Sequence, residues 1–291
     1  MKIAIPVDSM QGIGGGFTFQ RNLIKGLQLI GETVVTNPLE ADIVLISSVT
    51  MINKETFQRI KEFNKKVVVR LDNVPRNSRN RNTGTSRMKS YCEKADQIIW
   101  QSEWAKFYLE DFIGKEGKII YNGVDLNIFN PDGKTTEFDL NVPKDNFYLY
   151  SRFSRDETKH WETAWYEYQL IQRQNKLAKL IIVGKFAPEN IEWDFDFFRG
   201  ESYVFLGIII DSEKMAKLYR SCGWLMAPYF NDAFSNTYLE ALCTGVKLYK
   251  PDMSGGTPEM IKLFNEKGRE YFSLERMDKD YLKVFHEVLQ K

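Results

Sequence analysis

The sequence predicts an α/β fold built from two Rossmann-like domains, each a doubly wound parallel sheet with helices on both faces. Short apolar runs alternate with longer segments of helical periodicity over residues 1–125, and the alternation resumes after residue 146. A turn-rich polar stretch separates the two halves. The 291 residues, 43% of them hydrophobic, are enough for two domains of roughly 100 to 150 residues.

The N-terminal segment predicts a strand, a glycine-rich loop and a helix. Ile3–Val7 is a short apolar run, residues 12–16 are Gly-Ile-Gly-Gly-Gly, and apolar residues then recur at helical spacing from Phe17 to Leu29. The glycines do not have the G-x-G-x-x-G spacing of a dinucleotide fingerprint, and no acid follows a second strand at the expected interval. Two alternatives remain: a flexible turn, or a loop whose backbone approaches a ligand closely.

The rest of the first half predicts a parallel sheet. Strands are expected at residues 43–47, 66–71, 97–101 and 118–121, with helices at 54–63, at 86–95 and after Ser102, which is the expected N-cap. Asp72 follows the strand predicted at 66–71, which places it at the carboxyl edge where such sheets bind ligands. Capping of the next helix is the alternative for Asp72. Four aromatic residues of the helix after Ser102 are expected to face the core: Trp104, Phe107, Tyr108 and Phe112.

The segment 74–89 is rich in positive charge and shows no apolar period, so we expect a loop over the ligand site. Its basic residues are Arg76, Arg79, Arg81, Arg87 and Lys89. A loop of this kind can bind an anionic acceptor, such as a charged glycan, a phospholipid or DNA. The alternative is a solvated loop whose charge is balanced by distant acids.

The boundary between the halves is predicted from a tight turn at Asn122-Gly123 and the polar stretch that runs to Pro143. We therefore expect an N-terminal, acceptor-side domain at 1–125, a linker at 126–145 and a C-terminal domain at 146–291.

The second half begins with a predicted strand, Phe147–Ser151, that is followed at once by positive charge. The basic residues are Arg152, Arg155 and Lys159, and a helix is expected from His160 to Gln174. Further strands are expected at 180–184 and 203–207, and an amphipathic helix at 277–290. Three basic residues at the carboxyl end of a strand favour an anion site over simple surface charge.

Residues 223–261 predict a strand, a loop and a helix that together form a phosphate site. Trp224–Ala227 is a buried strand, Ser235 or Asn236 is the N-cap of the helix, and Gly245 ends it. The free N–H groups and the dipole of a helix N-terminus attract phosphate, so Phe234, Ser235, Asn236 and Thr237 are candidate phosphate-binding residues.

Two acids belong to the same segment. Glu240 lies one turn inside the helix, three residues after Thr237 and four after Asn236, so it shares their face. A carboxylate there suits hydroxyl groups better than phosphates. Asp232 precedes it by eight residues, in the loop before the N-cap. The alternative is that both are ordinary surface acids.

This pattern resembles the signature of family 4 retaining glycosyltransferases of the GT-B fold. The resemblance rests on two acids separated by seven residues, Phe234 two positions after the first acid, Glu-Ala-Leu at 240–242, and Gly245 five after the second acid. Asn-Gly-Val-Asp at 122–125 resembles the interdomain segment of the family. The chain departs from the signature with Asp at position 232, with Ala233 and Ser235 flanking the Phe, and with Gly-Val-Lys-Leu at 245–248.

The resemblance implies the roles of the site residues. Asp232 would contact the donor sugar and Glu240 the ribose, while Arg152 and Lys159, with Arg155 as a substitute, would clamp the diphosphate. The remaining donor-binding residues implied are Gly14, Gly15, Gly16, Gly184, Lys185 and Ile208. Asp72 would be a carboxylate close to the reacting sugar and the acceptor.

The implied activity is that of a retaining hexosyltransferase, in the 2.4 class of enzymes. It would move a sugar from a UDP- or GDP-linked donor to an acceptor hydroxyl across a cleft between the domains, with no metal and no other cofactor. Departure and attack on the same face of the sugar would retain the anomeric configuration. The alternatives are a phage-type DNA glycosyltransferase acting on hydroxymethylated bases, a non-catalytic nucleotide-sugar-binding protein and, as the weakest, a nicotinamide-dependent oxidoreductase.

Composition excludes several other classes. The net charge of +1 gives no global attraction to nucleic acid or membranes. The three cysteines are far apart and are expected to be reduced core residues of a cytoplasmic protein. No apolar run of 18 residues exists, so no integral membrane segment is expected. The two histidines have no partner at ligand spacing, so no structural zinc site is expected.

Overall fold

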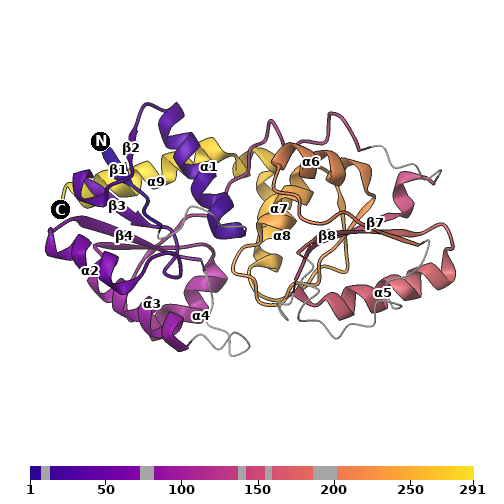
Figure 1. Ribbon diagram of the computed structural model, residues 1–291, viewed down its shortest axis with the longest axis horizontal. Coiled ribbons are helices and arrows are strands. Elements are labelled where there is room, and N and C mark those ends of the chain that lie inside the picture. Colours follow the sequence, from indigo (N-terminus) through magenta and orange to yellow (C-terminus); the bar gives the residue numbers. More distant parts are fainter. Residues whose placement is uncertain (8–13, 73–81, 137–141, 155–158, 186–201) are drawn as a thin grey trace. The chain divides into compact units, whose positions relative to one another are not determined.

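A computed structural model of the chain describes residues 1–7, 14–72, 82–136, 142–154, 159–185 and 202–291 (Figure 1). The chain divides into two compact units. Unit 1 comprises Met1–Asp125, Asp232–Ser235 and Pro258–Lys291, and unit 2 comprises Leu126–Asn231 and Asn236–Thr257.

Unit 1 is organised around a parallel sheet. Its strands, in spatial order, are β2 (Thr33–Val35), β1 (Lys2–Ala4), β3 (Ile43–Ile46), β4 (Lys66–Leu71), β5 (Gln97–Trp100) and β6 (Lys118–Ile119). Nearly every residue of β3, β4 and β5 is buried. This is expected for parallel strands that are covered on both faces, and it explains why most of their residues are apolar.

Helices cover both faces of this sheet (Figure 1). One face carries α2 (Lys54–Glu62), α3 (Asn82–Lys94) and α4 (Glu103–Ile113), and the other carries α1 (Gly15–Leu29) and α9 (Leu274–Leu289). Strand β3 shows the alternation that divides the two cores. Val44 and Ile46 pack with α2–α4, whereas Ile43 and Leu45 pack with α1 and α9.

Unit 2 contains a second parallel sheet. The order of its strands is β11 (Lys247–Tyr249), β10 (Trp224–Met226), β7 (Phe147–Phe153), β8 (Lys179–Gly184) and β9 (Tyr203–Phe205). Helix α5 (Trp161–Gln174) lies on one face, and α6 (Ser212–Ser221) and α7 (Asn236–Cys243) lie on the other (Figure 1). The α5 side of the core is rich in aromatic rings, with Trp161 of α5 packing edge-on against Tyr150 and Phe153 of β7.

These two sheets confirm the predicted fold class. The strand predicted at 66–71 has those bounds in the structure, and Ser102 caps α4 by accepting a hydrogen bond from the N–H of Ala105. The prediction does not include the edge strands β2 and β11. Each has three residues, which is too short to show a period.

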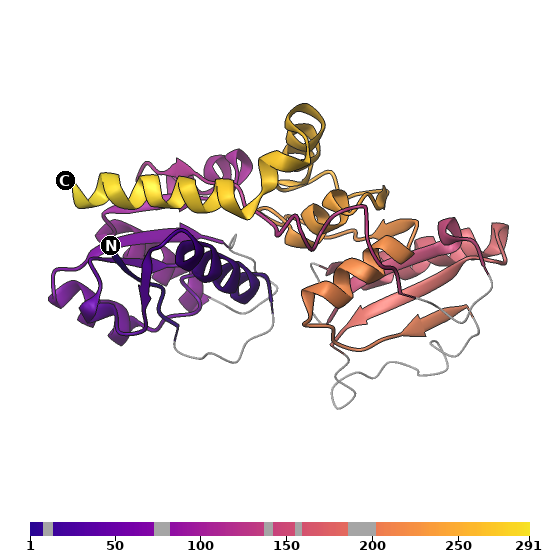
Figure 2. The same ribbon diagram turned by 90° about the horizontal axis from the view of Figure 1, so that it is seen from above.

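The C-terminal segment differs from the predicted domain at 146–291, because Pro258–Lys291 packs with unit 1. This segment holds most of α8 (Thr257–Lys267), a short 3₁₀ helix (Arg269–Phe272) and α9. Met277, Tyr281 and Phe285 of α9 are buried in a core shared with α1 and the sheet of unit 1. Figure 2 shows α9 along unit 1. Amphipathic periodicity predicts the helix but does not indicate which sheet it covers.

The predicted inward face of α4 is wrong. Phe107 is 80% exposed and Tyr108 52% exposed, while the face that packs on the sheet carries Ala105, Leu109 and Ile113. The buried residues follow the i, i+4, i+8 spacing of a single helix face. Trp104, Tyr108 and Phe112 lie on a neighbouring stripe, where Trp104 stacks on Tyr108, and Phe107 lies on the far side of the helix.

Two further expectations concern composition. Cys92, Cys222 and Cys243 are all buried and form no disulfide, as predicted. Within the described residues, no helix has the length and hydropathy that crossing a bilayer requires.

Candidate functional site

In unit 2, basic side chains gather where the central strands of the sheet end. Arg152 lies near the end of β7, Lys159 follows after residues 155–158, and Tyr229 follows β10, which pairs with β7. Arg155 lies outside the described residues. Parallel strands bring their carboxyl ends to one edge, so β7 and β10 deliver these side chains to the same place.

Arg152 adopts an unusual backbone conformation. Its φ of 67° is in the left-handed region, and the pairing of β7 with β8 shifts register between Tyr150 and Phe153. A β-bulge of this kind re-aims a side chain, and a positive φ at a non-glycine residue costs of order 1–3 kcal/mol. The sequence does not predict the bulge, because nothing in its composition marks Arg152 as left-handed.

Gly184 has a structural reason to be glycine. It has a φ of 152°, and a Cβ there would lie 2.3 Å from the backbone N and O of Phe153. The lack of a side chain therefore lets β8 pass the bulge in β7. Lys185, which is exposed, donates its backbone N–H to the carbonyl of Phe153 at 2.7 Å, and Ile208 is 43% exposed. Donor contacts of Gly184, Lys185 and Ile208 stay predictions.

Both described cations lie over one aromatic ring. The Lys159 ammonium is 4.7 Å and the Arg152 guanidinium carbon 5.7 Å from the centroid of the Tyr229 ring. Lys159 is only 3% exposed, and Tyr229 is completely buried. In such an arrangement, the negative face of the aromatic ring attracts the cation.

Glu240 lies on α7, in a polar cluster with a tyrosine of α6. The hydroxyl of Tyr219 donates to a carboxylate oxygen of Glu240 at 3.3 Å. Burial raises the pKa of Glu240 to about 7, against the opposing effects of the Tyr219 hydrogen bond and the positive charge of Arg152. Burial also raises the pKa of Tyr219 well above its usual value, so this phenol is a neutral donor.

The first turn of α7 is the predicted phosphate site. The helix begins at Asn236, so Ser235 occupies the predicted N-cap position, but its buried hydroxyl has no hydrogen-bond partner within the described part of the chain. Thr237 is buried as well. The helix has eight residues, enough to leave N–H groups unsatisfied at its first turn.

The loop Asp232–Ser235 clusters with unit 1. The hydroxyl of Ser102 donates to the carbonyl of Ala233 at 2.8 Å, and the side-chain amide of Asn122 donates to the carbonyl of Phe234 at 3.2 Å. These two side chains fix the backbone next to Asp232. Neither contact can be predicted from the sequence, because the partners are 131 and 112 residues apart.

Asn122 also belongs to a buried network below the edge of the unit 1 sheet. Its carbonyl oxygen accepts from Arg70 at 3.0 Å, and its amide also donates to Gln101 at 3.0 Å. Arg70 donates to the carbonyl of Ser47 at 3.0 Å. The Asn-Gly-Val-Asp segment is therefore anchored in the core of unit 1 by the side chain of its Asn.

Asp72 lies beside the first turn of α1, which begins at Gly15 after Gly14 at a φ of 144°. A Cβ on Gly16 would lie 3.5 Å from a carboxylate oxygen of Asp72. A carboxylate in this place is stabilised by the dipole of α1. Capping of the next helix, the alternative role of Asp72, stays a prediction. The contact of Gly14–Gly16 with a donor diphosphate stays a prediction.

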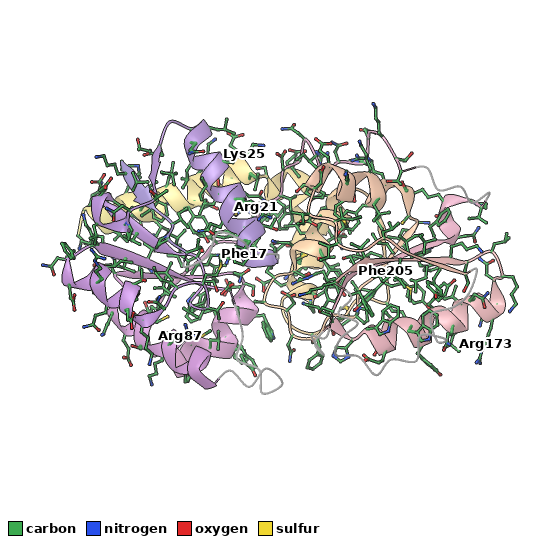
Figure 3. All side chains as sticks on the ribbon, viewed as in Figure 1. Phe17, Arg21, Lys25, Arg87, Arg173 and Phe205 are labelled. Atoms are coloured by element: carbon green, nitrogen blue, oxygen red, sulfur yellow. The ribbon has the colours of Figure 1, made fainter. Side chains whose placement is uncertain are left out.

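One of the predicted acceptor-binding arginines is described. Arg87 lies on α3 and donates to the carbonyl of Ile52 at 3.4 Å (Figure 3). Arg76, Arg79 and Arg81 lie outside the described residues.

Within unit 2, the structure thus brings together Arg152, Lys159, Tyr229, Tyr219 and Glu240. The two tyrosines are not among the site residues predicted from the sequence. The position of Tyr229, soon after a buried strand, is a signal that could have identified it. Among the described residues, no group of three or more His, Cys, Asp or Glu side chains could hold a metal ion.

No protein-family model and no curated protein sequence matches this chain. Solved structures do match. Sucrose-phosphate synthase from Thermosynechococcus elongatus has a TM-score of 0.74 at 16% identity, covering 99% of each chain. HepE from Anabaena in complex with UDP has a TM-score of 0.70 at 14% identity, covering 99% of this chain and 100% of that one.

A third match is shorter. The pneumococcal O-GlcNAc transferase GtfA in complex with UDP and GlcNAc has a TM-score of 0.59 at 15% identity, covering 94% of this chain and 60% of that one. At these identities the likeness concerns the fold alone. The chain therefore has the GT-B fold, as predicted.

Proposed function

We propose that the protein is a glycosyltransferase that moves a sugar from a nucleoside diphosphate sugar to an acceptor hydroxyl. The observation that carries the proposal is the pair of cations, Arg152 and Lys159, at the carboxyl edge of the unit 2 sheet. The fold supports it, since HepE with the same fold has been solved with UDP-glucose. The proposed donor is UDP- or GDP-linked.

The cations would act on the leaving group. As the glycosidic bond breaks, negative charge grows on the departing nucleoside diphosphate, and fixed positive groups stabilise that charge. The first turn of α7 would add backbone N–H groups and the positive end of its dipole. These two features lie in the same unit: Arg152 and Lys159 lie at and just after the end of β7, and α7 follows β10.

Glu240 would hold the nucleotide by its ribose. An ionised carboxylate accepts hydrogen bonds from two neighbouring hydroxyl groups, and it cannot donate to a phosphate. Tyr219 fixes one oxygen of Glu240 from the α6 side. In this proposal Asp232 contacts the donor sugar and Asp72 is the acceptor-side carboxylate.

The finer chemistry follows the family 4 resemblance. The reaction would retain the anomeric configuration and need no metal, with the two cations neutralising the diphosphate instead. The leaving phosphate would take the proton of the attacking hydroxyl on the same face of the sugar. The acceptor would be anionic: a glycan, a phospholipid or DNA, bound by Arg76, Arg79, Arg81 and Arg87.

The test uses donor hydrolysis and two arginine variants. Thermal unfolding with a panel of UDP- and GDP-sugars first identifies the donor, because a bound ligand raises the melting temperature by mass action. We expect Arg152→Ala to lower hydrolysis of that donor about 100- to 1,000-fold, as loss of one transition-state charge contact does. The matched control is Arg173→Ala, since Arg173 is exposed near the end of α5 (Figure 3).

Two results would contradict the proposal. The first is that no nucleotide sugar shifts the melting temperature. The second is that Arg152→Ala hydrolyses the donor as fast as Arg173→Ala. Binding without any hydrolysis or transfer by the wild-type protein would instead favour a non-catalytic nucleotide-sugar-binding protein.

A further inference from the structure

Tyr229 connects both cations of the candidate site to the sheet. Its ring lies beneath Lys159 at 4.7 Å and Arg152 at 5.7 Å, measured to the ring centroid. Its hydroxyl donates to the backbone carbonyl of Ser151 and lies 3.2 Å from the Ser151 hydroxyl. Ser151, which holds the Tyr229 ring, directly precedes Arg152, which lies over that ring.

The ring is fixed on its other sides by packing. It is completely buried and packs against two other tyrosine rings, with centroid distances of 6.5 Å for Tyr150 and 5.7 Å for Tyr238. Tyr150 also donates its hydroxyl to the backbone carbonyl of Lys159 at 2.9 Å. Both the ring and the backbone of the lysine above it are thus tied to β7.

An aromatic ring has a particular advantage as a support for these cations. It attracts them through its quadrupole and leaves their full positive charge in place. A carboxylate in the same position would neutralise that charge and would repel a diphosphate. The positive φ of Arg152 is consistent with such a support, because strain of this kind persists where the surroundings over-determine the conformation.

We propose that Tyr229 is a positioning residue, whose ring holds Arg152 and Lys159 ready for the diphosphate of a nucleotide ligand. This inference rests on the proposed function and extends it to a residue that contacts the cations rather than the reacting atoms. Loss of the ring selectively weakens recognition of the diphosphate. Recognition of the nucleoside, which does not depend on the two cations, is retained.

The experiment measures the affinity of UDP by calorimetry and that of uridine by ligand-observed NMR, with GDP and guanosine in parallel. For Tyr229→Leu we expect about 5- to 50-fold weaker binding of the nucleotide, from the loss of two cation–π contacts. The nucleoside should bind within twofold of its wild-type affinity. Tyr229→Phe keeps the ring and should bind the nucleotide within about threefold of wild type.

Tyr249→Leu is the matched control. Tyr249 ends β11 and carries the exposed Lys250 at 5.6 Å from its ring centroid, so this variant also removes a cation–π contact from unit 2. We expect its affinity for UDP to equal that of the wild type.

A second measurement keeps the shape of the ring. Phenylalanine with one, two and three ring fluorines at position 229 weakens the ring quadrupole stepwise, and nucleotide affinity should fall stepwise with it. This series decides the question if circular dichroism shows that Tyr229→Leu does not fold. A flat series, or an equal loss of nucleotide and nucleoside binding in Tyr229→Leu, overturns the positioning role alone. Absence of UDP and GDP binding to the wild type overturns the proposed function, and this inference with it.

Discussion

Each unit places a cation against an aromatic ring near the carboxyl end of a central strand. In unit 1, the Arg70 guanidinium carbon lies 3.6 Å from the centroid of the Phe19 ring. In unit 2, Arg152 and Lys159 lie over Tyr229. The contact is of the same kind in both units, but the surroundings of the cation differ.

The two arginines differ in their exposure to solvent and in the surroundings of their guanidinium groups. Arg70 is 2% exposed and donates to the carbonyl of Ser47 and to Asn122, so its charge serves the interior of unit 1. Arg152 is partly exposed and lies in a bulge at the end of its strand. A ring under an interior cation stabilises the fold, whereas a ring under a cation at the edge can prepare it for a ligand.

The comparison predicts opposite outcomes for the two arginines. Arg70→Ala should lower the free energy of unfolding by about 3–5 kcal/mol, because it leaves the oxygens of Ser47 and Asn122 buried without this donor and opens a cavity. Arg152→Gly should change it by less than about 1 kcal/mol, since glycine tolerates the positive φ. Urea unfolding followed by circular dichroism measures both.

The control for cavity formation is Arg70→Met, which fills the space without restoring the hydrogen bonds. We expect it to recover part of the stability lost in Arg70→Ala. Equal destabilisation by Arg70→Ala and Arg152→Gly would break the comparison, because Arg152 would then be a core residue like Arg70.

Much of the fold could be predicted because its signals are local. The strand Lys66–Leu71 is marked by three consecutive valines, and Ser102 is an N-cap; both signals depend on a few neighbouring residues. The side of a helix that packs on the sheet is harder to predict from the sequence when aromatic residues lie outside the buried stripe. In α4, Leu109 faces the sheet and Phe107 does not. The assignment of α9 to unit 1 depends on shape complementarity with α1, which no periodicity encodes.

The candidate site could be predicted only in part, for a related reason. Arg152, Lys159 and Glu240 carry charges that stand out in an apolar context, so the sequence identifies them. Tyr229 is one of 14 tyrosines, and its role depends on what lies above its ring. Likewise the Ser102 contact to Ala233 joins residues 131 positions apart.

The two units also differ in how they use a buried acid. Burial raises the pKa of Asp278 in unit 1 and of Glu240 in unit 2, each to about 7. Asp278 is 2% exposed, on α9 against α1, and a Cβ on Gly26 would overlap its carboxylate. Its Oδ1 has no hydrogen-bond partner within the described residues. Glu240 is hydrogen-bonded to Tyr219.

We predict that Asp278 makes the stability of the protein depend on pH. Its pKa rises from 3.8 to about 7 on folding, so between about pH 4 and pH 7 the folded state holds a proton that the unfolded state has lost. Stability therefore falls as the pH rises through this range and levels off above it. Asp278→Asn removes this term and should be more stable than wild type by about 2–3 kcal/mol at pH 8, but not at pH 4.

Urea unfolding of both proteins at pH 4, 6 and 8 measures the effect. Arg276 opposes the shift through its charge, so the wild-type curve will be shallower than burial alone would make it. A constant difference between the two proteins at all three pH values would show that Asp278 does not change protonation on folding.

Ionisation of Glu240 over the same pH range should change the affinity for the nucleotide ligand, with a smaller effect in free energy. Because the ionised carboxylate accepts hydrogen bonds from two hydroxyls, the proposed ribose contact strengthens as the pH rises through about 7. We expect the affinity for UDP-glucose, or for the donor found in the thermal screen, to rise up to about tenfold between pH 6 and pH 8. The phosphates of such a donor are fully ionised throughout, so they do not contribute to the slope. Glu240→Gln should bind more weakly at pH 8 and lose the slope, and an unchanged slope in this variant would remove Glu240 from the nucleotide site.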